Sequence, residues 1–184
     1  MPGSGLGSTL EVTEPLRAAL PDLVRRLGIK SLLDVGCGDF TWMRQVELGC
    51  DYIGVDIVDS VIEANRAAST TPSRQFLVMD AVEGLPDMSA DLILCREVLF
   101  HLSFADARQL LRNALGTGCR YMLLTSDGAT SFNSDIESGD FRVVNLQRRP
   151  FGLPTPEQRI EDSGVIGGRF VGLWSAEAIR QALG

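Results

Sequence analysis

The sequence predicts an α/β fold built on a doubly wound, mostly parallel sheet. Short apolar runs of strand length alternate with segments of helical period between residues 31 and 126. Such alternation is typical of parallel strands joined by right-handed crossovers. A pair of glycines, Gly36 and Gly38, follows the first apolar run, at the place where sheets of this kind bind ligands.

The length and composition favour one globular domain. A chain of 184 residues with 45% hydrophobic and 22% charged residues can bury a full core. We expect residues 1–10, which are rich in glycine and serine, to form a flexible tail, and residues 11–184 to form the domain. The formal net charge of −7 argues against a nucleic-acid partner, because the broad basic surface that such proteins carry is missing.

The location indicated by the sequence is the cytoplasm. No apolar run approaches the roughly 20 residues needed to cross a bilayer, and the first residues do not resemble a secretory signal. The four cysteines are scattered without a CxxC pair, and His101 is the only histidine. This pattern favours reduced thiols and argues against a Cys/His metal site.

The first helix is expected over residues 13–28, where leucines recur at helical spacing. Thr13 can cap its start and Gly28 its end, and we expect Pro21 to kink or split it. Strands are predicted at the apolar runs 31–36, 51–56, 74–80, 91–96 and 119–126. Between them, helices are predicted over 40–49, over 60–69 after a cap at Asp59, and after the Ser103 and Asp106 capping pair.

The pattern changes after Ser126. Residues 127–140 are a polar loop, whereas 141–146 and 168–174 have the composition of strands. The segment between those strands, 147–167, is rich in proline and glycine and is expected to be a long loop. A short helix is predicted over residues 175–184.

The glycine loop fits a ligand that contains adenosine. Two glycines after a strand let a ligand approach the backbone and the N–H groups that open a helix. Asp56 ends the second strand, 56 − 38 = 18 residues after Gly38, close to the position of a ribose-binding acid. The third glycine of a dinucleotide loop would fall at Thr41, and Asp34 would repel a pyrophosphate. A ligand with an ammonium and a sulfonium group would be attracted instead.

Four segments then carry a family resemblance. "LLDVGCGDFTW", "YIGVDI", "FLVMDAVEGLP" and "DLILCREVLFHL" resemble, in order and spacing, the motifs of class I S-adenosylmethionine-dependent methyltransferases. The resemblance covers roughly residues 30 to 126. It implies a Rossmann-like sheet with an antiparallel last strand, the cofactor S-adenosyl-L-methionine, and methyl transfer as the activity.

The resemblance also implies roles for single residues. The loop would lie against the methionine part of the cofactor, and so would the residues after the fourth strand: Asp34, Gly36, Cys37, Gly38, Cys95 and Arg96. Asp56 and Ile57 would hold the ribose and one edge of the adenine. Asp80, with the Ala81 backbone beside it, would accept from the adenine amino group. In the alternative interpretation, Asp80 is a helix cap or a solvated loop acid, and Cys37 and Cys95 are packing residues.

The acceptor side is less defined by the sequence. His101 follows the fourth strand and carries the imidazole, the group suited to take a proton near neutral pH. It is equally a candidate for a structural role. Asp127, Asn133 and Asn145 are polar enough to bind substrate hydroxyls, and Phe132, Phe151 and Trp174 could form an apolar wall.

The preferred substrate is a small polar acceptor, with O-methylation of a sugar or secondary metabolite. Because the helix expected between the last strands is replaced by an irregular loop, the acceptor would bind in an open cleft or in a pocket completed by a homodimer. Two other functions remain open at this point. One is a non-catalytic cofactor-binding module that scaffolds or regulates a partner, and the other is an NAD-linked oxidoreductase.

Overall fold

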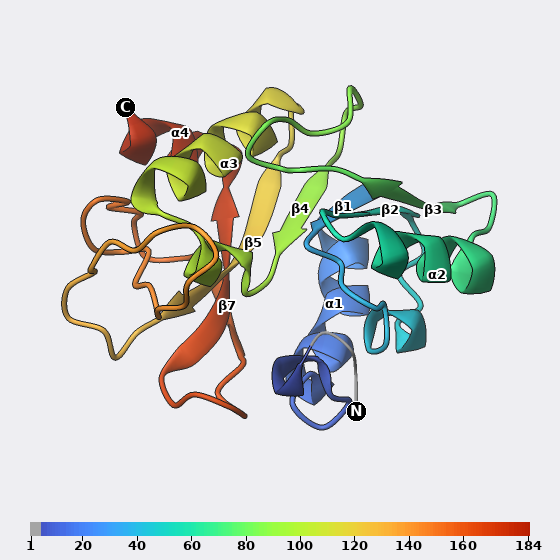
Figure 1. Cartoon of the computed structure of the whole chain (residues 1–184), viewed down its shortest axis with the longest axis horizontal. Coiled ribbons are helices and arrows are strands. Elements are labelled where there is room, and N and C mark those ends of the chain that lie inside the picture. The colour runs from blue at the N-terminus through green and yellow to red at the C-terminus, as the bar shows by residue number, and fades with distance from the viewer. Residues whose placement is uncertain (1–4) are drawn as a thin grey trace.

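A computed structural model describes residues 5–184 of the protein. Its centre is a seven-stranded sheet in the order β3-β2-β1-β4-β5-β7-β6. The strands are β1 (Ser31–Val35), β2 (Asp51–Asp56), β3 (Arg74–Val78), β4 (Leu92–Cys95), β5 (Tyr121–Asp127), β6 (Gln158–Glu161) and β7 (Arg169–Ser175). Strands β1 to β5 are parallel, and β7 is antiparallel to both β5 and β6. In Figure 1, β4 and β7 accordingly run in opposite directions. The predicted fold class is confirmed.

The order of the strands reverses between β1 and β4. From β1 the chain proceeds outward to β2 and β3, then returns to β4 on the other side of β1. Val35 at the end of β1 is in register with Val55 of β2 and with Cys95 of β4. The segments that leave these three strands therefore diverge from one level of one edge, and such a switch point is where open α/β sheets bind ligands.

Each face of the sheet is covered by two helices. Helices α1 (Glu14–Arg26) and α2 (Asp59–Ser69) contribute Leu20 and Ile62 to one core, and α3 (Phe104–Gly116) and α4 (Ala176–Leu183) contribute Leu110 and Ile179 to the other. Because alternate residues of a strand point to opposite faces, β4 supplies both cores. A strand buried on both faces must be apolar throughout, which explains the run Leu92–Cys95.

The prediction of a helix over residues 40–49 is wrong. Only the short 3-10 helix η2 (Met43–Gln45) forms there. Gly38 and Phe40 have φ angles of 56° and 57°, in the left-handed region, and helical hydrogen bonding cannot pass through such residues. Phe40 and Met43 instead bury their side chains in the α1 and α2 core, so hydrophobic contacts determine the path of this loop.

Four other predictions need correction. The segment 141–146 is not a strand, because its backbone bonds are isolated and form no ladder; Arg142 N–H donates to the Phe100 carbonyl, and the Val144 carbonyl accepts from Asp127 N–H at the end of β5. Strand β6 forms within the segment that was expected to be a loop. Pro21 does not split α1, which continues from Glu14 to Arg26. Val58 is the residue before α2, and Asp59 is its first residue.

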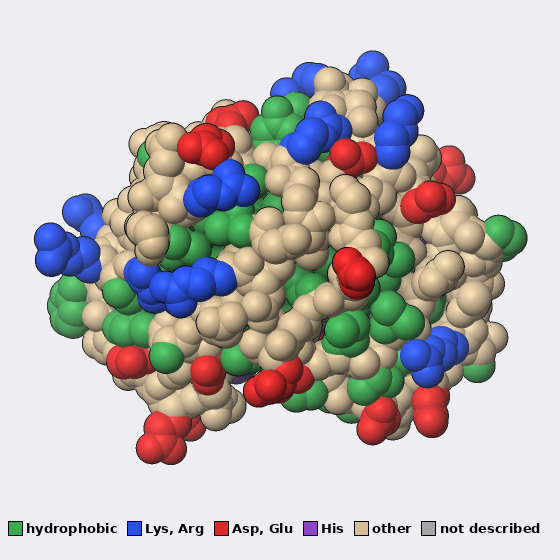
Figure 2. All heavy atoms as spheres, turned by 90° about the horizontal axis from the view of Figure 1, so that it is seen from above, with side chains coloured by type: hydrophobic (Ala, Val, Ile, Leu, Met, Phe, Trp, Pro, Cys, Tyr) green, Lys and Arg blue, Asp and Glu red, His purple; other side chains and the backbone are tan. Residues whose placement is uncertain are grey.

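The predicted tail, residues 1–10, is only partly described. Residues 1–4 lie outside the described residues, whereas Leu6–Ser8 form the 3-10 helix η1 and lead into α1. On the face seen in Figure 2, acidic and basic side chains are interspersed, with hydrophobic side chains between them. Within residues 5–184, no helix is long and apolar enough to span a membrane.

Candidate functional site

A cavity of about 760 Å³ opens at the carboxyl edge of the sheet. We call it the carboxyl-edge cavity. It is lined by the loop after β1 and by the segments that follow β2, β3 and β4, together with Ser138 and Gly139 from the chain after β5. The volume is within the usual range for a small-molecule site. Ten of the eleven residues predicted for the cofactor and for base catalysis line this cavity: Asp34, Gly36, Cys37, Gly38, Asp56, Ile57, Asp80, Ala81, Arg96 and His101.

The glycine loop is held in place by bonds to β2. The N–H groups of Gly36 and Cys37 both donate to the Val55 carbonyl, at 2.8 and 3.0 Å. Gly38 N–H donates to Asp56 Oδ2 at 3.0 Å. Gly36 has a φ of 74°, and a Cβ at this position would overlap Val98 Cγ2. Glycine is therefore required here both by backbone conformation and by the close approach of Val98.

Asp34 is a buried acid at the floor of the cavity, 3% exposed. Tyr52 Oη donates to Asp34 Oδ2 at 2.7 Å, and no ion pair to Asp34 forms among residues 5–184. Burial raises the pKa of Asp34 to about 7, even though the Tyr52 hydrogen bond acts in the opposite direction. A buried carboxyl with no ion-pair contact among the described residues favours a ligand that brings its own positive charge.

Asp56 and Asp80 lie at the carboxyl ends of neighbouring strands: Asp56 is the last residue of β2, and Asp80 follows β3 by two residues. Both accept from the backbone two residues onward, Asp56 from Val58 N–H at 3.1 Å and Asp80 from Val82 N–H at 2.9 Å. These turns point the carboxylates along the cavity wall and leave them further lone pairs. Such acceptors fit the hydroxyl and amino groups of an adenosine.

The two cysteines of the predicted set have the properties of packing residues. Cys37 lines the cavity, whereas Cys95 is buried in the core and does not. Burial raises the pKa of both thiols well above the ordinary value. Because η2 does not begin at Cys37, no helix terminus opposes this effect. Neither thiol is thus prepared to act as a nucleophile.

Arg96 belongs to a buried ion cluster that the sequence does not reveal. Its guanidinium binds Asp162 in a bidentate manner, with distances of 3.1 and 2.7 Å. Arg169 donates from Nε to the Asp162 carbonyl and forms an ion pair with Glu97, whose backbone has a φ of 67°. Glu97 lines the cavity, so this cluster of Arg96, Glu97, Asp162 and Arg169 forms part of its wall. Asp162 and Arg169 are 66 and 73 residues from Arg96 in the sequence, which explains why no local motif indicated that they interact with it.

His101 ends the short helix η3 (Val98–His101) and is exposed. Its Nδ1 lies 3.0 Å from the Asp140 carbonyl oxygen, and its ring lies 5.3 Å from that of Phe141. Because a carbonyl can only accept, Nδ1 carries the proton of the neutral imidazole. The lone pair is consequently on Nε2.

The predicted substrate residues Asp127, Asn133 and Asn145 do not line the carboxyl-edge cavity. Asp127 accepts from the N–H groups of Ala129 and Thr130. Asn133 and Asn145 bond each other's backbone groups, and Asn145 also donates to the Thr130 carbonyl. Their side chains hold the loop after β5, while Phe151 and Trp174 are buried in the core and Phe132 is exposed.

The N-terminal segment also reaches the cavity. Ser8 is one of the lining residues, and a Cβ on Gly7 would meet the Glu97 carboxylate. Sequence reasoning missed this contact because a stretch rich in glycine and serine resembles a linker. The absence of a side chain at position 7 is what allows the segment to approach Glu97.

A family model described as "Methyltransferase domain" matches residues 33–117, the part that contains the glycine loop, Asp56, Asp80 and His101. Residues 33–117 thus match a methyltransferase domain, and the fold of the chain is that of class I S-adenosylmethionine-dependent methyltransferases. The predicted family, enzyme class and cofactor, S-adenosyl-L-methionine, are thereby confirmed, and the NAD-linked alternative is set aside. A search of curated proteins found no match.

Solved structures of methyltransferases share the fold. The chain is 16% identical to 1,6-didemethyltoxoflavin-N1-methyltransferase from Burkholderia thailandensis, with a TM-score of 0.70 over 94% of this chain and 81% of that one. It is 14% identical to the N-methyltransferase NodS from Bradyrhizobium japonicum WM9, with a TM-score of 0.64 over 90% of this chain and 96% of that one. It is 13% identical to magnesium protoporphyrin IX methyltransferase from Synechocystis PCC 6803 with bound SAM, with a TM-score of 0.61 over 93% of this chain and 86% of that one. The NodS complex with S-adenosylhomocysteine is matched over 66% of each chain.

Proposed function

We propose that the methyltransferase domain methylates a hydroxyl group on a small polar acceptor, a sugar or a secondary metabolite. The observation that carries this proposal is His101, which lines the carboxyl-edge cavity with Nδ1 engaged by the Asp140 carbonyl. A hydroxyl acceptor must lose a proton during transfer, and Nε2 of His101 is a base free to accept it.

The cofactor would lie along the four strand ends. We propose that Asp56 and Ile57 hold the ribose, that Asp80 and the Ala81 backbone bind the adenine, and that the glycine loop and Asp34 contact the methionine part. The charge of Asp34 suits the cationic groups of that part. Bound S-adenosylmethionine would supply a methyl group already activated by its positive sulfur. Cys95 and the paired Arg96 would support this wall from behind.

The protein residues then position the acceptor and handle its proton. The acceptor would occupy the space near His101, Glu97 and Ser138, with its hydroxyl in line with the methyl group. Formation of the new C–O bond would be matched by loss of the bond between the methyl carbon and the sulfur, with S-adenosylhomocysteine as the leaving product, and His101 Nε2 would take the proton released from the acceptor O–H. The Asp140 carbonyl stabilises the imidazolium through Nδ1–H, as an orienting group does in other acid–base pairs.

The test is a panel of matched acceptors that carry either a hydroxyl or an amine, with release of S-adenosylhomocysteine as the readout. His101→Ala should slow transfer to the preferred hydroxyl acceptor about 10²-fold, the usual contribution of a general base. His101→Asn is the matched variant, because its amide N–H can retain the bond to the Asp140 carbonyl but cannot act as a base.

The outcomes separate the alternatives. If His101 only holds the loop, His101→Asn should turn over at nearly the wild-type rate, which would contradict its role as base. Transfer to amines alone would refute the hydroxyl preference. Binding of S-adenosylhomocysteine without turnover of any acceptor would favour the scaffolding module.

We further propose that residues 11–184 act as one domain in the cytoplasm, without a nucleic-acid or membrane partner. All four cysteines are free thiols, which suits a reducing compartment. The homodimer that would complete the acceptor pocket stays a prediction. Light scattering on the purified protein, with and without S-adenosylhomocysteine, would test it.

A further inference from the structure

Asn65 is a polar side chain on the buried face of α2. Ile62 and Asn65 are the buried residues of this helix, and their spacing of three positions places them on the same face. Ile62 packs in the hydrophobic core, whereas Asn65, which is 3% exposed, carries an amide. Burial of an amide is unfavourable unless it forms hydrogen bonds. The partner of the Asn65 amide therefore indicates the role of this residue.

That partner is the glycine loop. Asn65 Nδ2 donates to the Gly38 carbonyl at 2.7 Å. The Cys37 thiol is a second donor to the same carbonyl, at 3.7 Å, but thiols are weak donors. On its other side, Gly38 N–H donates to Asp56 Oδ2 at 3.0 Å. Gly38 is thus held at both of its backbone polar groups, by α2 at the carbonyl and by the end of β2 at the N–H.

Gly38 needs this restraint because glycine has little conformational preference of its own. Its φ angle of 56° lies in the left-handed region, and no side chain limits rotation about its backbone bonds. The bond from Asn65 fixes the carbonyl of Gly38. It thereby favours the backbone orientation in which the N–H of Gly38 meets the carboxylate of Asp56.

Asp56 in turn depends on that N–H for its own orientation. Oδ2 accepts from Gly38 N–H, and Oδ1 accepts from Val58 N–H at 3.1 Å. Both oxygens are thereby directed by backbone donors, and Asp56 lines the carboxyl-edge cavity. Asn65 does not line this cavity, so it can influence a bound ligand only through such intermediate groups.

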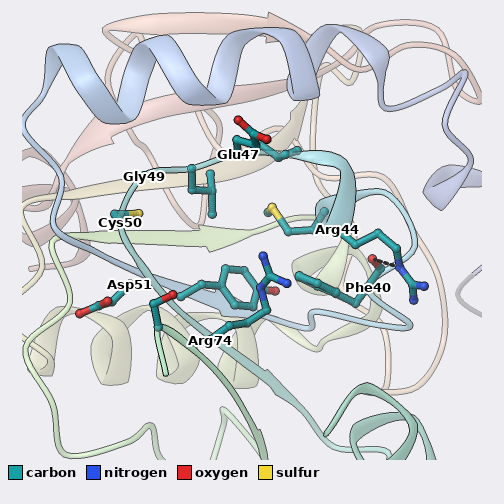
Figure 3. A pocket seen from close by; sticks show the side chains of 12 residues that line it. Phe40, Arg44, Glu47, Gly49, Cys50, Asp51 and Arg74 are labelled. Carbon is teal, nitrogen blue, oxygen red and sulfur yellow. Dashed lines mark hydrogen bonds between the residues drawn. The ribbon is translucent and has the colours of Figure 1, made fainter. Parts of the chain in front are cut away.

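The next part of the loop has separate support, from Arg44. Figure 3 shows Arg44 beside the Phe40 carbonyl, to which its Nε donates at 3.2 Å. Arg44 Nη2 also donates to the Asp39 carbonyl at 3.3 Å. Arg44 and Phe40 line a second cavity, which shares no lining residue with the carboxyl-edge cavity. Arg44 thus holds carbonyls of the same loop from outside the cofactor site, which makes it a matched control for Asn65.

We propose that Asn65 is a positioning residue for the cofactor. Through the backbone of Gly38, it holds the Asp56 carboxylate in the orientation that binds the ribose hydroxyls. This inference rests on the proposed binding of ribose by Asp56. It predicts that loss of the Asn65 amide weakens recognition of the ribose hydroxyls and leaves the rest of the cofactor contacts in place.

The test compares two ligands on the full chain by calorimetry: S-adenosylhomocysteine and its analogue without the 2′ and 3′ hydroxyls. The wild-type protein should bind S-adenosylhomocysteine about 10- to 100-fold more tightly than the analogue, the usual contribution of hydrogen bonds to a charged group. Asn65→Ala should weaken binding of S-adenosylhomocysteine roughly tenfold and binding of the analogue less than about twofold. Arg44→Gln should leave the ratio of the two affinities at its wild-type value.

Two further variants complete the design. Asn65→Leu keeps the branched shape of the side chain but has no donor, so it should reproduce the selective loss even where the alanine variant is too unstable to measure. Asp56→Ala should remove most of the difference between the two ligands. Urea denaturation of each variant shows that the protein measured is folded.

A purely structural role for Asn65 predicts that both ligands are weakened equally, and that result in folded variants would overturn the proposal. Unchanged affinities would overturn it too, as would the same selective loss in Arg44→Gln. If Asp56→Ala keeps the full difference between the ligands, the ribose assignment is wrong and the proposal fails with it. If Asp56→Ala loses the difference while the Asn65 variants keep it, only the role of Asn65 is wrong. Methyl transfer and His101 do not enter any of these outcomes.

Discussion

The region of alternating strands and helices, residues 31–127, and the return segment, residues 128–168, build one cavity by different means. The first region places Asp34, Asp56 and Arg96 at the ends of adjacent strands, where regular geometry brings them together. The return segment has no helix and only the edge strand β6. It is held by side chains such as Asn145 and Arg142 that bond to backbone carbonyls.

This comparison shows which interactions hold each part of the site in place. In the first region the backbone ladder fixes the site, and individual side chains are free to serve a ligand. In the return segment the polar side chains form hydrogen bonds to backbone groups, because a buried carbonyl or N–H group without a partner destabilises the fold. A polar residue there is therefore a poor guide to a substrate contact.

Gly36→Ala is expected to have the largest effect on the first region. A Cβ at φ 74° would be strained and would overlap Val98, so the free energy of unfolding should fall by about 2–4 kcal/mol and binding of S-adenosylhomocysteine should be lost. Thermal unfolding and calorimetry measure the two effects. Gly84→Ala is the control, since its Cβ would meet nothing within 4 Å. Wild-type binding by Gly36→Ala would show that the loop is not held closely.

Asp162→Asn tests the tie between the two regions. Asp162 is 1% exposed and binds Arg96 through two hydrogen bonds, so removing its charge should cost about 3–5 kcal/mol of unfolding free energy. Urea denaturation at neutral pH gives the value. Asp22→Asn, which breaks an exposed pair with Arg25, should cost less than about 1 kcal/mol. Similar costs for both variants would contradict the role of the buried cluster.

Asp34→Asn should raise the free energy of unfolding above neutral pH, whereas the two substitutions above lower it. Burial raises the pKa of Asp34 from 3.8 to about 7, so the folded state holds this proton at a pH where the unfolded state has released it. This contribution is fully present below pH 3.8, and stability is lost as pH rises toward 7. Above neutral pH, Asp34→Asn should therefore be more stable than the wild type by roughly 1–3 kcal/mol.

The measurement for Asp34 is urea denaturation at several pH values between 4 and 8. At the acid end the two proteins should have nearly equal stability. The variant should bind S-adenosylmethionine more weakly at pH 8, because under the proposed function Asp34 supplies the charge that attracts its cationic part. An unchanged pH dependence in Asp34→Asn would mean that another group is responsible.

The smallest effect is expected for Asn145→Ala in the return segment. Loss of the bond to the Thr130 carbonyl and of the acceptor for Gln147 N–H should lower the free energy of unfolding by about 1–2 kcal/mol. The affinity for S-adenosylhomocysteine should not change, because Asn145 does not reach the cavity. A drop in the affinity for an identified acceptor, with intact stability, would instead restore Asn145 as a substrate ligand.

The sequence predicts the first region well for a physical reason. Buried parallel strands must be apolar throughout, and ligand-facing residues follow them directly, so Gly36, Asp56 and Asp80 stand at recognisable places. The same local reasoning fails at residues 40–49, where Phe40 and Trp42 look helical but are buried in a loop. It fails again at Asp162 and Arg169, whose partners Arg96 and Glu97 are distant in the chain and approach only after the sheet has formed.

The position of Asp162 and Arg169 in the chain has a consequence for synthesis. During synthesis, the glycine loop, Asp56 and Arg96 emerge from the ribosome before the hairpin of β6 and β7. Until residue 169 has emerged, Arg96 has no buried acid to bind and β5 has no antiparallel neighbour. The nascent chain therefore carries every proposed cofactor ligand in an incomplete cavity. The wall at Arg96 takes its final form only when that hairpin is added.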